Sequence, residues 1–135
     1  MPGRRARSKF WSMEGQHKSL KVRFESGLEK RFLDQCYMLG IKVERCDIIV
    51  PYKDSTGKWH QYHPDFNLPE YRYVVEIKGS WAFRDNHGFV AEKFRAAMVK
   101  FDGRYTIITE KELKTDFVSK LIKSLLEEKR LGNRL

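Results

Sequence analysis

The sequence predicts a single α/β domain with a mixed central β-sheet flanked by helices. Its 135 residues suit one domain. Apolar residues make up 41% of the chain, too many for a disordered protein, and the 33% of charged residues excludes a membrane-embedded one. Helical and strand-like patterns alternate in the order helix, three strands, helix, strand and helix, which is typical of the α/β class.

A first helix is expected between Ser26 and Gly40. Ser26 and Glu29 have the spacing of a capping box, in which two side chains satisfy the first free amides of a helix. Apolar residues then recur at helical spacing, at Leu28, Phe32, Cys36 and Leu39. Gly40 is a typical helix stop.

Three strands are expected after this helix. Residues 41–52 alternate and then become continuously apolar, and residues 53–58 form a polar turn. Residues 59–67 and 71–78 also have strand patterns, and the short connection Leu68-Pro69-Glu70 joins them tightly. These segments together indicate a hairpin or a meander.

The C-terminal part is expected to contain a helix, a strand and a helix. The second helix ends at Asp102-Gly103, and its apolar face consists of Val90, Phe94, Ala97, Met98 and Phe101. Residues 105–109 form a short buried strand. Thr109 and Glu112 have the spacing of a second capping box, which opens a third helix that runs to about Lys129. Its apolar face consists of Leu113, Phe117, Leu121, Ile122, Leu125 and Leu126.

Positive charge is concentrated at the N-terminus. The chain has 27 Lys and Arg against 18 Asp and Glu, a formal charge of +9. We therefore divide it into a basic arm (1–24), a core (25–109) and a C-terminal amphipathic helix and tail (110–135). The arm has Glu14 as its one acid, against Arg4, Arg5, Arg7, Lys9, Lys18, Lys21 and Arg23. Such an arm fits DNA phosphates, although a solvated tail has the same composition; the aromatic residues Phe10 and Trp11 favour nucleic acid.

No membrane partner is expected, because no apolar run approaches the roughly 20 residues of a transmembrane helix. The basic N-terminus lacks the apolar stretch of a secretion signal. Cys36 and Cys46 are the only cysteines and form no CxxC pair, which is typical of an intracellular protein.

The strongest functional signal is a group of acidic residues with a lysine. Glu76 and Lys78 lie two apart in a strand and therefore project to one face, while Val75 and Ile77 project to the other. Asp65 reaches the same place if its strand pairs antiparallel with that one. Two carboxylates on a rigid sheet suit Mg²⁺.

The chemistry that uses this group is phosphodiester hydrolysis. In that hypothesis Asp65 and Glu76 bind the metal, Lys78 orients the attacking water, and Glu29 completes a second metal position. His63 shares the face of Asp65 and is a candidate phosphate contact.

Each residue also has a structural explanation. Glu29 fits a helix cap, Asp65 a turn, and Glu76 with Lys78 a cross-strand ion pair, while His63 fits an exposed imidazole. Taken together, these structural explanations are less convincing, because an acid and a lysine inside an apolar strand would bury charge without a partner.

The same residues carry a resemblance to known nucleases. P-D followed by E-x-K resembles the PD-(D/E)xK superfamily, which has a restriction-endonuclease-like core. A longer series of motifs resembles the phage endonuclease I family of Holliday-junction resolvases over roughly residues 24–108. These motifs are Phe24-Glu25-Ser26-Gly27-Leu28-Glu29, Gly40-Ile41-Lys42, Val50-Pro51-Tyr52, Tyr62-His63-Pro64-Asp65-Phe66 and Val75-Glu76-Ile77-Lys78-Gly79-Ser80-Trp81.

The resemblance implies that Glu29, Asp65 and Glu76 bind Mg²⁺, with Mn²⁺ as a substitute, and that Lys78 assists the attacking water. It also implies a strand-exchanged homodimer, with the exchanged segment near residues 48–52, in which each active site mixes residues of both chains and Glu29 can come from the other subunit. A phage-encoded enzyme of this kind works in the cytoplasm of a bacterial host.

Two departures from the family pattern leave the substrate open. The pattern is lost beyond Thr109, and the arm is longer than the resemblance requires. The alternatives to a junction-resolving enzyme are a homing-type endonuclease that cuts a duplex site, the nuclease subunit of a transposase, and a non-catalytic DNA-binding module.

Overall fold

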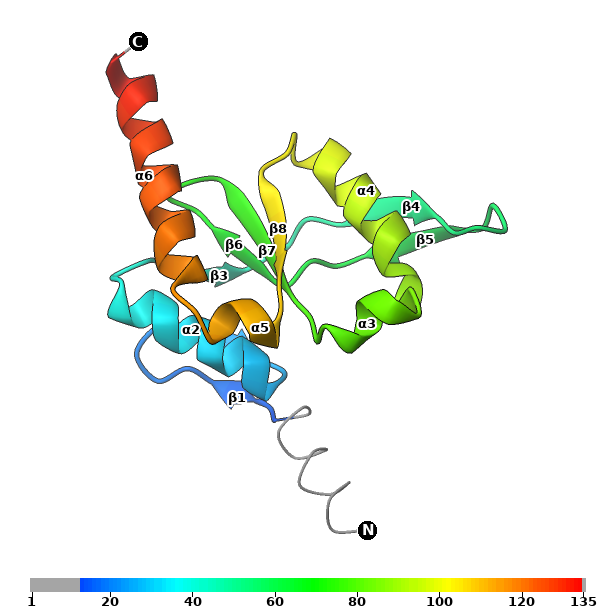
Figure 1. Ribbon diagram of the computed structural model, residues 1–135, viewed down its shortest axis with the longest axis horizontal. Coiled ribbons are helices and arrows are strands. Elements are labelled where there is room, and N and C mark those ends of the chain that lie inside the picture. Colours follow the sequence, from blue (N-terminus) through cyan, green and yellow to red (C-terminus); the bar gives the residue numbers. More distant parts are fainter. Residues whose placement is uncertain (1–12, 135) are drawn as a thin grey trace.

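The computed structural model describes residues 13–134 and has the expected mixed α/β architecture. Its central sheet has four strands in the order β3-β6-β7-β8: β3 (Glu44–Arg45), β6 (Phe66–Leu68), β7 (Tyr73–Ile77) and β8 (Tyr105–Ile108). β7 pairs antiparallel with β6 and parallel with β8, so the sheet is mixed. Figure 1 shows α2, α5 and α6 on one side of this sheet and α3, α4 and the β4–β5 hairpin on the other.

Each face of the sheet has its own hydrophobic core. Val75 and Ile77 of β7 pack with α2 (Gly27–Met38), α5 (Glu110–Leu113) and α6 (Phe117–Arg134). Val74, on the opposite face, packs with α4 (Val90–Lys100) and with the hairpin of β4 (Val50–Lys53) and β5 (Trp59–Tyr62). The alternation along β7 thus separates two apolar layers.

The predicted first and second helices are confirmed. α2 has Ser26 as its N-cap and ends just before Gly40, whose positive φ of +71° suits a residue without a side chain. α4 ends before Asp102 and Gly103, as the sequence predicts. A short helix α3 (Trp81–Arg84) and a 3₁₀ turn (His87–Phe89) precede α4 and were not predicted.

The prediction of one strand over residues 41–52 is wrong. The chain pairs with β6 only at β3, then leaves the central sheet, and forms β4 beside β5 in a separate two-stranded sheet. The strand predicted over residues 59–67 is also split, into β5 and β6. Pro64 lies in the break and has no amide hydrogen to donate to a ladder.

The predicted C-terminal helix is divided as well. Thr109 and Glu112 form the predicted capping box of α5, which ends after one turn. The Thr115 hydroxyl then accepts a hydrogen bond from the Phe117 amide at 3.2 Å and starts α6.

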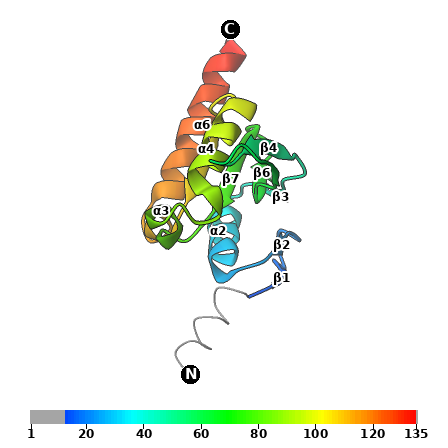
Figure 2. The same ribbon diagram turned by 90° about the vertical axis from the view of Figure 1, so that its right-hand side faces the viewer.

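The described part of the N-terminal segment is folded. β1 (Gly15–Gln16) and β2 (Arg23–Phe24) pair antiparallel beside α2, as Figure 2 shows. His17 is buried, and its ring nitrogen lies 2.9 Å from an Asp34 carboxylate oxygen of α2. The predicted DNA contacts Arg4, Arg5, Arg7 and Lys9 lie outside the described residues.

None of the described helices is long and apolar enough to cross a membrane.

Candidate active site

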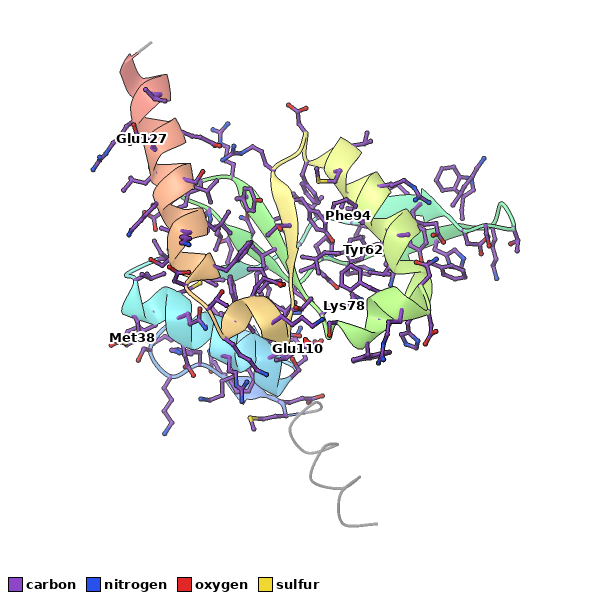
Figure 3. All side chains as sticks on the ribbon, in the orientation of Figure 1. Met38, Tyr62, Lys78, Phe94, Glu110 and Glu127 are labelled. Carbon is purple, nitrogen blue, oxygen red and sulfur yellow. The ribbon has the colours of Figure 1, made fainter. Side chains whose placement is uncertain are left out.

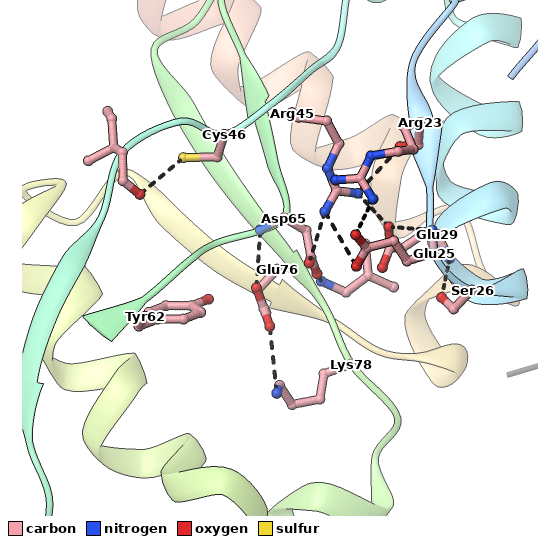
Figure 4. Close-up of polar contacts among 12 residues, drawn as sticks. Arg23, Glu25, Ser26, Glu29, Arg45, Cys46, Tyr62, Asp65, Glu76 and Lys78 are labelled. Atoms are coloured by element: carbon pink, nitrogen blue, oxygen red, sulfur yellow. Dashed lines mark hydrogen bonds and ion pairs between the residues drawn. The ribbon is translucent and has the colours of Figure 1, made fainter. Parts of the chain in front are cut away.

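Asp65 and Glu76 lie opposite each other, where the start of β6 faces the end of β7. Phe66 pairs with Val75 in the antiparallel register, which brings Asp65 opposite Glu76. The Asp65 amide donates to Glu76 Oε1 at 3.2 Å, and the Ile77 amide donates to Asp65 Oδ2 at 2.8 Å. Each carboxylate is therefore fixed by the backbone of the opposite segment (Figure 4).

Lys78 follows β7 and faces the same way as Glu76, as strand alternation predicts. Its ammonium nitrogen lies 3.5 Å from Glu76 Oε2, and its amide donates to the Ile108 carbonyl at 3.0 Å. The next turn is fixed by Glu110, which accepts hydrogen bonds from the Ser80 amide and hydroxyl. Figure 3 labels Lys78, just after β7, and Glu110, at the start of α5.

Glu29 forms the helix cap that the sequence predicts and also lies close to the central acidic residues. Ser26 Oγ accepts a hydrogen bond from the Glu29 amide at 3.1 Å, which is the helix cap. The Glu29 carboxylate accepts from the Glu25 amide, one residue before the cap, and from Arg45 Nη1 at 2.6 Å. Glu29 is only 6% exposed, so its charge is directed into the protein rather than into solvent.

Arg45 connects Glu29 to Asp65. Besides its short contact to Glu29, its guanidinium lies 3.8 Å from Asp65 Oδ1 and 4.8 Å from the centre of the Phe66 ring. It also donates to the Arg23 carbonyl at 3.4 Å. Sequence reasoning missed this residue, and the only signal for it was a charge inside a strand-like segment.

Burial raises the pKa of both central carboxyl groups. The pKa of Asp65 is raised well above its usual range, first by desolvation and then by the negative charges of Glu76 and Glu29, while Arg45 opposes the shift. Desolvation also raises the pKa of Glu76, and Lys78 opposes that shift. A buried and a half-buried carboxyl group whose pKa values are both raised favour a proton or a bound cation.

Two tyrosines that the sequence did not single out complete one wall. The hydroxyls of Tyr62 and Tyr105 lie 2.7 Å apart in a buried pair. Burial and then the negative charge of Glu76 raise the pKa of Tyr62, so the Tyr62 hydroxyl lies within electrostatic range of that carboxylate. Tyr62 lies on the α4 side of the sheet (Figure 3).

The other predicted DNA contacts in the described residues are exposed. His63 lies two residues before Asp65 and projects to solvent, and Lys18 and Lys21 are exposed in the segment before α2. Arg23 pairs with Glu25 and is connected to the site through its carbonyl. Of these four residues, Arg23 is the one that a hydrogen bond connects to the acidic group, through Arg45.

A metal would have to bind mainly to Asp65 and Glu76. Among residues 13–132, no cluster of three or more His, Cys, Asp and Glu side chains is close enough to bind a metal ion. Two carboxylates nevertheless fit Mg²⁺, which in proteins often uses one or two of them together with water and substrate phosphate. Glu29 is separated from this pair by Arg45.

The family model for phage endonuclease I matches residues 10–119. The chain belongs to the phage endonuclease I family. The match extends beyond residues 24–108 at both ends, so the family pattern does not stop at Thr109 as the sequence suggested. Searches of the curated proteins and of the solved structures gave no match.

Family membership makes the chain a nuclease that acts on DNA. Asp65, Glu76 and Lys78 lie within the matched range, as do Glu29 and Arg45. In this phage endonuclease I chain, Asp65 and Glu76 therefore lie where the start of β6 faces the end of β7.

Proposed function

We propose that this phage endonuclease I chain is a Mg²⁺-dependent endonuclease of the PD-(D/E)xK type that resolves branched DNA such as a Holliday junction. The observation that carries the proposal is the mutual fixing of Asp65 and Glu76, with Lys78 3.5 Å from Glu76. A P-D segment opposite an E-x-K strand is the arrangement that gives the superfamily its name. Its site of action would be the cytoplasm of the bacterial host.

Asp65 and Glu76 would bind the divalent ion, with Mn²⁺ as a substitute for Mg²⁺. When bound, that ion supplies a Lewis acid for the phosphate and lowers the pKa of a ligating water. The backbone hydrogen bonds to both carboxylates fix their positions before substrate arrives. Lys78 would donate a hydrogen bond to the attacking water and offset the charge that develops on the phosphate.

Glu29 enters the proposal as a further metal ligand that is paired with Arg45. The ion pair of 2.6 Å neutralises Glu29, and the same guanidinium faces Asp65. Direct ligation by Glu29 therefore requires Arg45 to move away from it.

A strand-exchanged homodimer remains part of the proposal. Two symmetric sites suit a reaction that cuts two strands of a junction. In this structure one chain brings its own Glu29 close to Asp65 through Arg45, so exchange is not needed to bring the two residues together. Support for exchange comes from Ile48 and Ile49, which connect β3 to β4 and are 41% and 43% exposed.

The decisive experiment compares a labelled four-way junction with a matched linear duplex, with Mg²⁺ and with EDTA. We expect cleavage of the junction alone, and only with the metal. Asp65→Asn should abolish cleavage while DNA binding is kept or strengthened, because a carboxylate near phosphate repels it. Asp47→Asn, at an exposed aspartate, serves as the matched control.

Each other outcome points to a different function. A single cut in the duplex would support a homing-type endonuclease. Absence of cleavage with either DNA would contradict the proposal and favour a partner-dependent nuclease subunit or a non-catalytic binding module. Cleavage that survives both Asp65→Ala and Glu76→Ala would show that the site has been assigned to the wrong residues.

A further inference from the structure

Lys93 projects from the first turns of α4 towards the Tyr62 side of the active site. Its ammonium nitrogen lies 5.5 Å from the centre of the Tyr62 ring, a distance typical of a cation–π contact. It is also close to the backbone of Gly88, where an added Cβ would be 3.6 Å away. The lysine is therefore partly enclosed by Tyr62 and the turn before α4.

The ammonium of Lys93 lacks an acidic partner in the described part of the chain. None of the ion pairs among residues 13–132 includes it, although lysines elsewhere, such as Lys30 and Lys120, pair with aspartates. Desolvation lowers the pKa of Lys93, with a further contribution from the positive charge of Lys78. A partly desolvated cation without a counter-ion is costly unless an anion arrives.

Lys93 also lies within electrostatic range of the central acidic residues. Glu76 and Asp65 both raise its pKa, in opposition to the effect of Lys78. Tyr62 provides the structural link, because its ring faces Lys93 and its hydroxyl lies 2.7 Å from that of Tyr105. Burial and then the negative charge of Glu76 raise the pKa of both tyrosines. Lys78 and Lys93 thus approach Glu76 from two different elements, the end of β7 and the start of α4.

We propose that Lys93 forms a second phosphate-binding position in this site, in addition to Lys78. The inference rests on the proposed endonuclease function and extends it to the way the substrate strand is bound. The ligand is a phosphate of the DNA strand that reaches the partly exposed Lys93 ammonium. The ring of Tyr62 holds the ammonium in place without neutralising it, so the full charge remains available to the phosphate.

The test uses variants that separate charge from packing. Lys93→Gln removes the charge with little change in length, and Lys93→Arg keeps the charge. Lys100→Gln is the matched control, because Lys100 lies on the same helix and is exposed. Thermal melting of each variant shows whether it remains folded.

Two measurements on the four-way junction test the proposal. Fluorescence anisotropy across a salt series, with Ca²⁺ in place of Mg²⁺, should show the slope of log affinity against log salt reduced by about 0.9 in Lys93→Gln, the value for a single phosphate neutralised by a lysine. Single-turnover cleavage with Mg²⁺ should slow by about tenfold or more in Lys93→Gln. Lys93→Arg should restore the slope, and Lys100→Gln should leave the cleavage rate unchanged.

The result that overturns the proposal is equal behaviour of Lys93→Gln and Lys100→Gln in both measurements. A failure of the wild type to cut any DNA would instead count against the proposed endonuclease function. Even then the anisotropy slope decides whether Lys93 binds phosphate, because that measurement does not depend on cleavage.

Discussion

We expect Asp65→Asn to stabilise the metal-free protein, in EDTA at neutral pH. The same substitution should abolish cleavage in Mg²⁺. The Ile77 amide donates to Asp65 Oδ2 at 2.8 Å, and an asparagine carbonyl can accept the same bond. What the substitution removes is a buried negative charge beside Glu76 and Glu29, the two acids that raise its pKa. The carboxylate is thus maintained at a cost in stability, as is common for active-site groups.

The direction of the pKa shift gives the sign of the expected change in the free energy of unfolding, and the energy of each pH unit gives its scale. Because the pKa of Asp65 is higher in the folded protein than in the unfolded chain, the folded state binds the proton more tightly. The free energy of unfolding should therefore fall as the pH rises from about 3.9, the unfolded value, through the raised folded value. For each pH unit between these two pKa values, the wild type loses about 1.4 kcal/mol of its free energy of unfolding. We expect Asp65→Asn to gain at least about 1 kcal/mol near neutral pH and little near pH 4.

Urea denaturation in EDTA, followed by tryptophan fluorescence at both pH values, measures this difference. Asp47→Asn should stay within about 0.5 kcal/mol of the wild type at both, since Asp47 is exposed. Added Mg²⁺ should stabilise the wild type by mass action but not Asp65→Asn. A variant that loses stability at neutral pH, or gains as much near pH 4, would refute the reasoning.

Three further predictions concern the surroundings of the site. Ser26→Ala should lower the free energy of unfolding by about 1 kcal/mol, measured in urea, with junction cleavage unchanged; slower cleavage would mean that the cap positions Glu29. Arg45→Met keeps the packing against the Phe66 ring but leaves Glu29 unpaired, and should cost about 2 kcal/mol in EDTA; a neutral result would contradict the ion pair. Glutamine substitutions in the arm should each reduce the salt slope of DNA binding by about 0.9 where the substituted residue binds a phosphate, and an unchanged slope would exclude the arm from binding. The positions to change are Arg4, Arg5, Arg7 and Lys9.

The helix α2 and the end of β7 could be predicted because local sequence determines them. The Ser26 cap, the Gly40 stop and the helical spacing in between are all short-range signals, and α2 has those bounds. The break between β3 and β4 has no such signal, because strand-like residues continue through it. That break is a tertiary feature, since β3 pairs with β6 while β4 pairs with β5.

The candidate site was predictable in part for a related reason. Strand alternation alone places Lys78 on the face of Glu76, and the antiparallel pairing of β6 with β7 brings Asp65 opposite. Arg45 and Lys93 reach the site from β3 and α4, two elements whose positions no local pattern specifies. Their roles follow only from distances in the folded chain.

Arg45 explains how Glu29 and Asp65 come to lie together. Its guanidinium is 2.6 Å from Glu29 and 3.8 Å from Asp65, and the Phe66 ring covers part of it. A divalent ion at Asp65 and Glu76 would repel this guanidinium, whereas the shorter contact with Glu29 would retain it. In the proposed function Glu29 would therefore act first as the counter-charge of Arg45, and it would be free to bind metal only when Arg45 pairs with another anion. A DNA phosphate is such an anion and accepts the guanidinium readily, so metal ligation by Glu29 would depend on bound substrate.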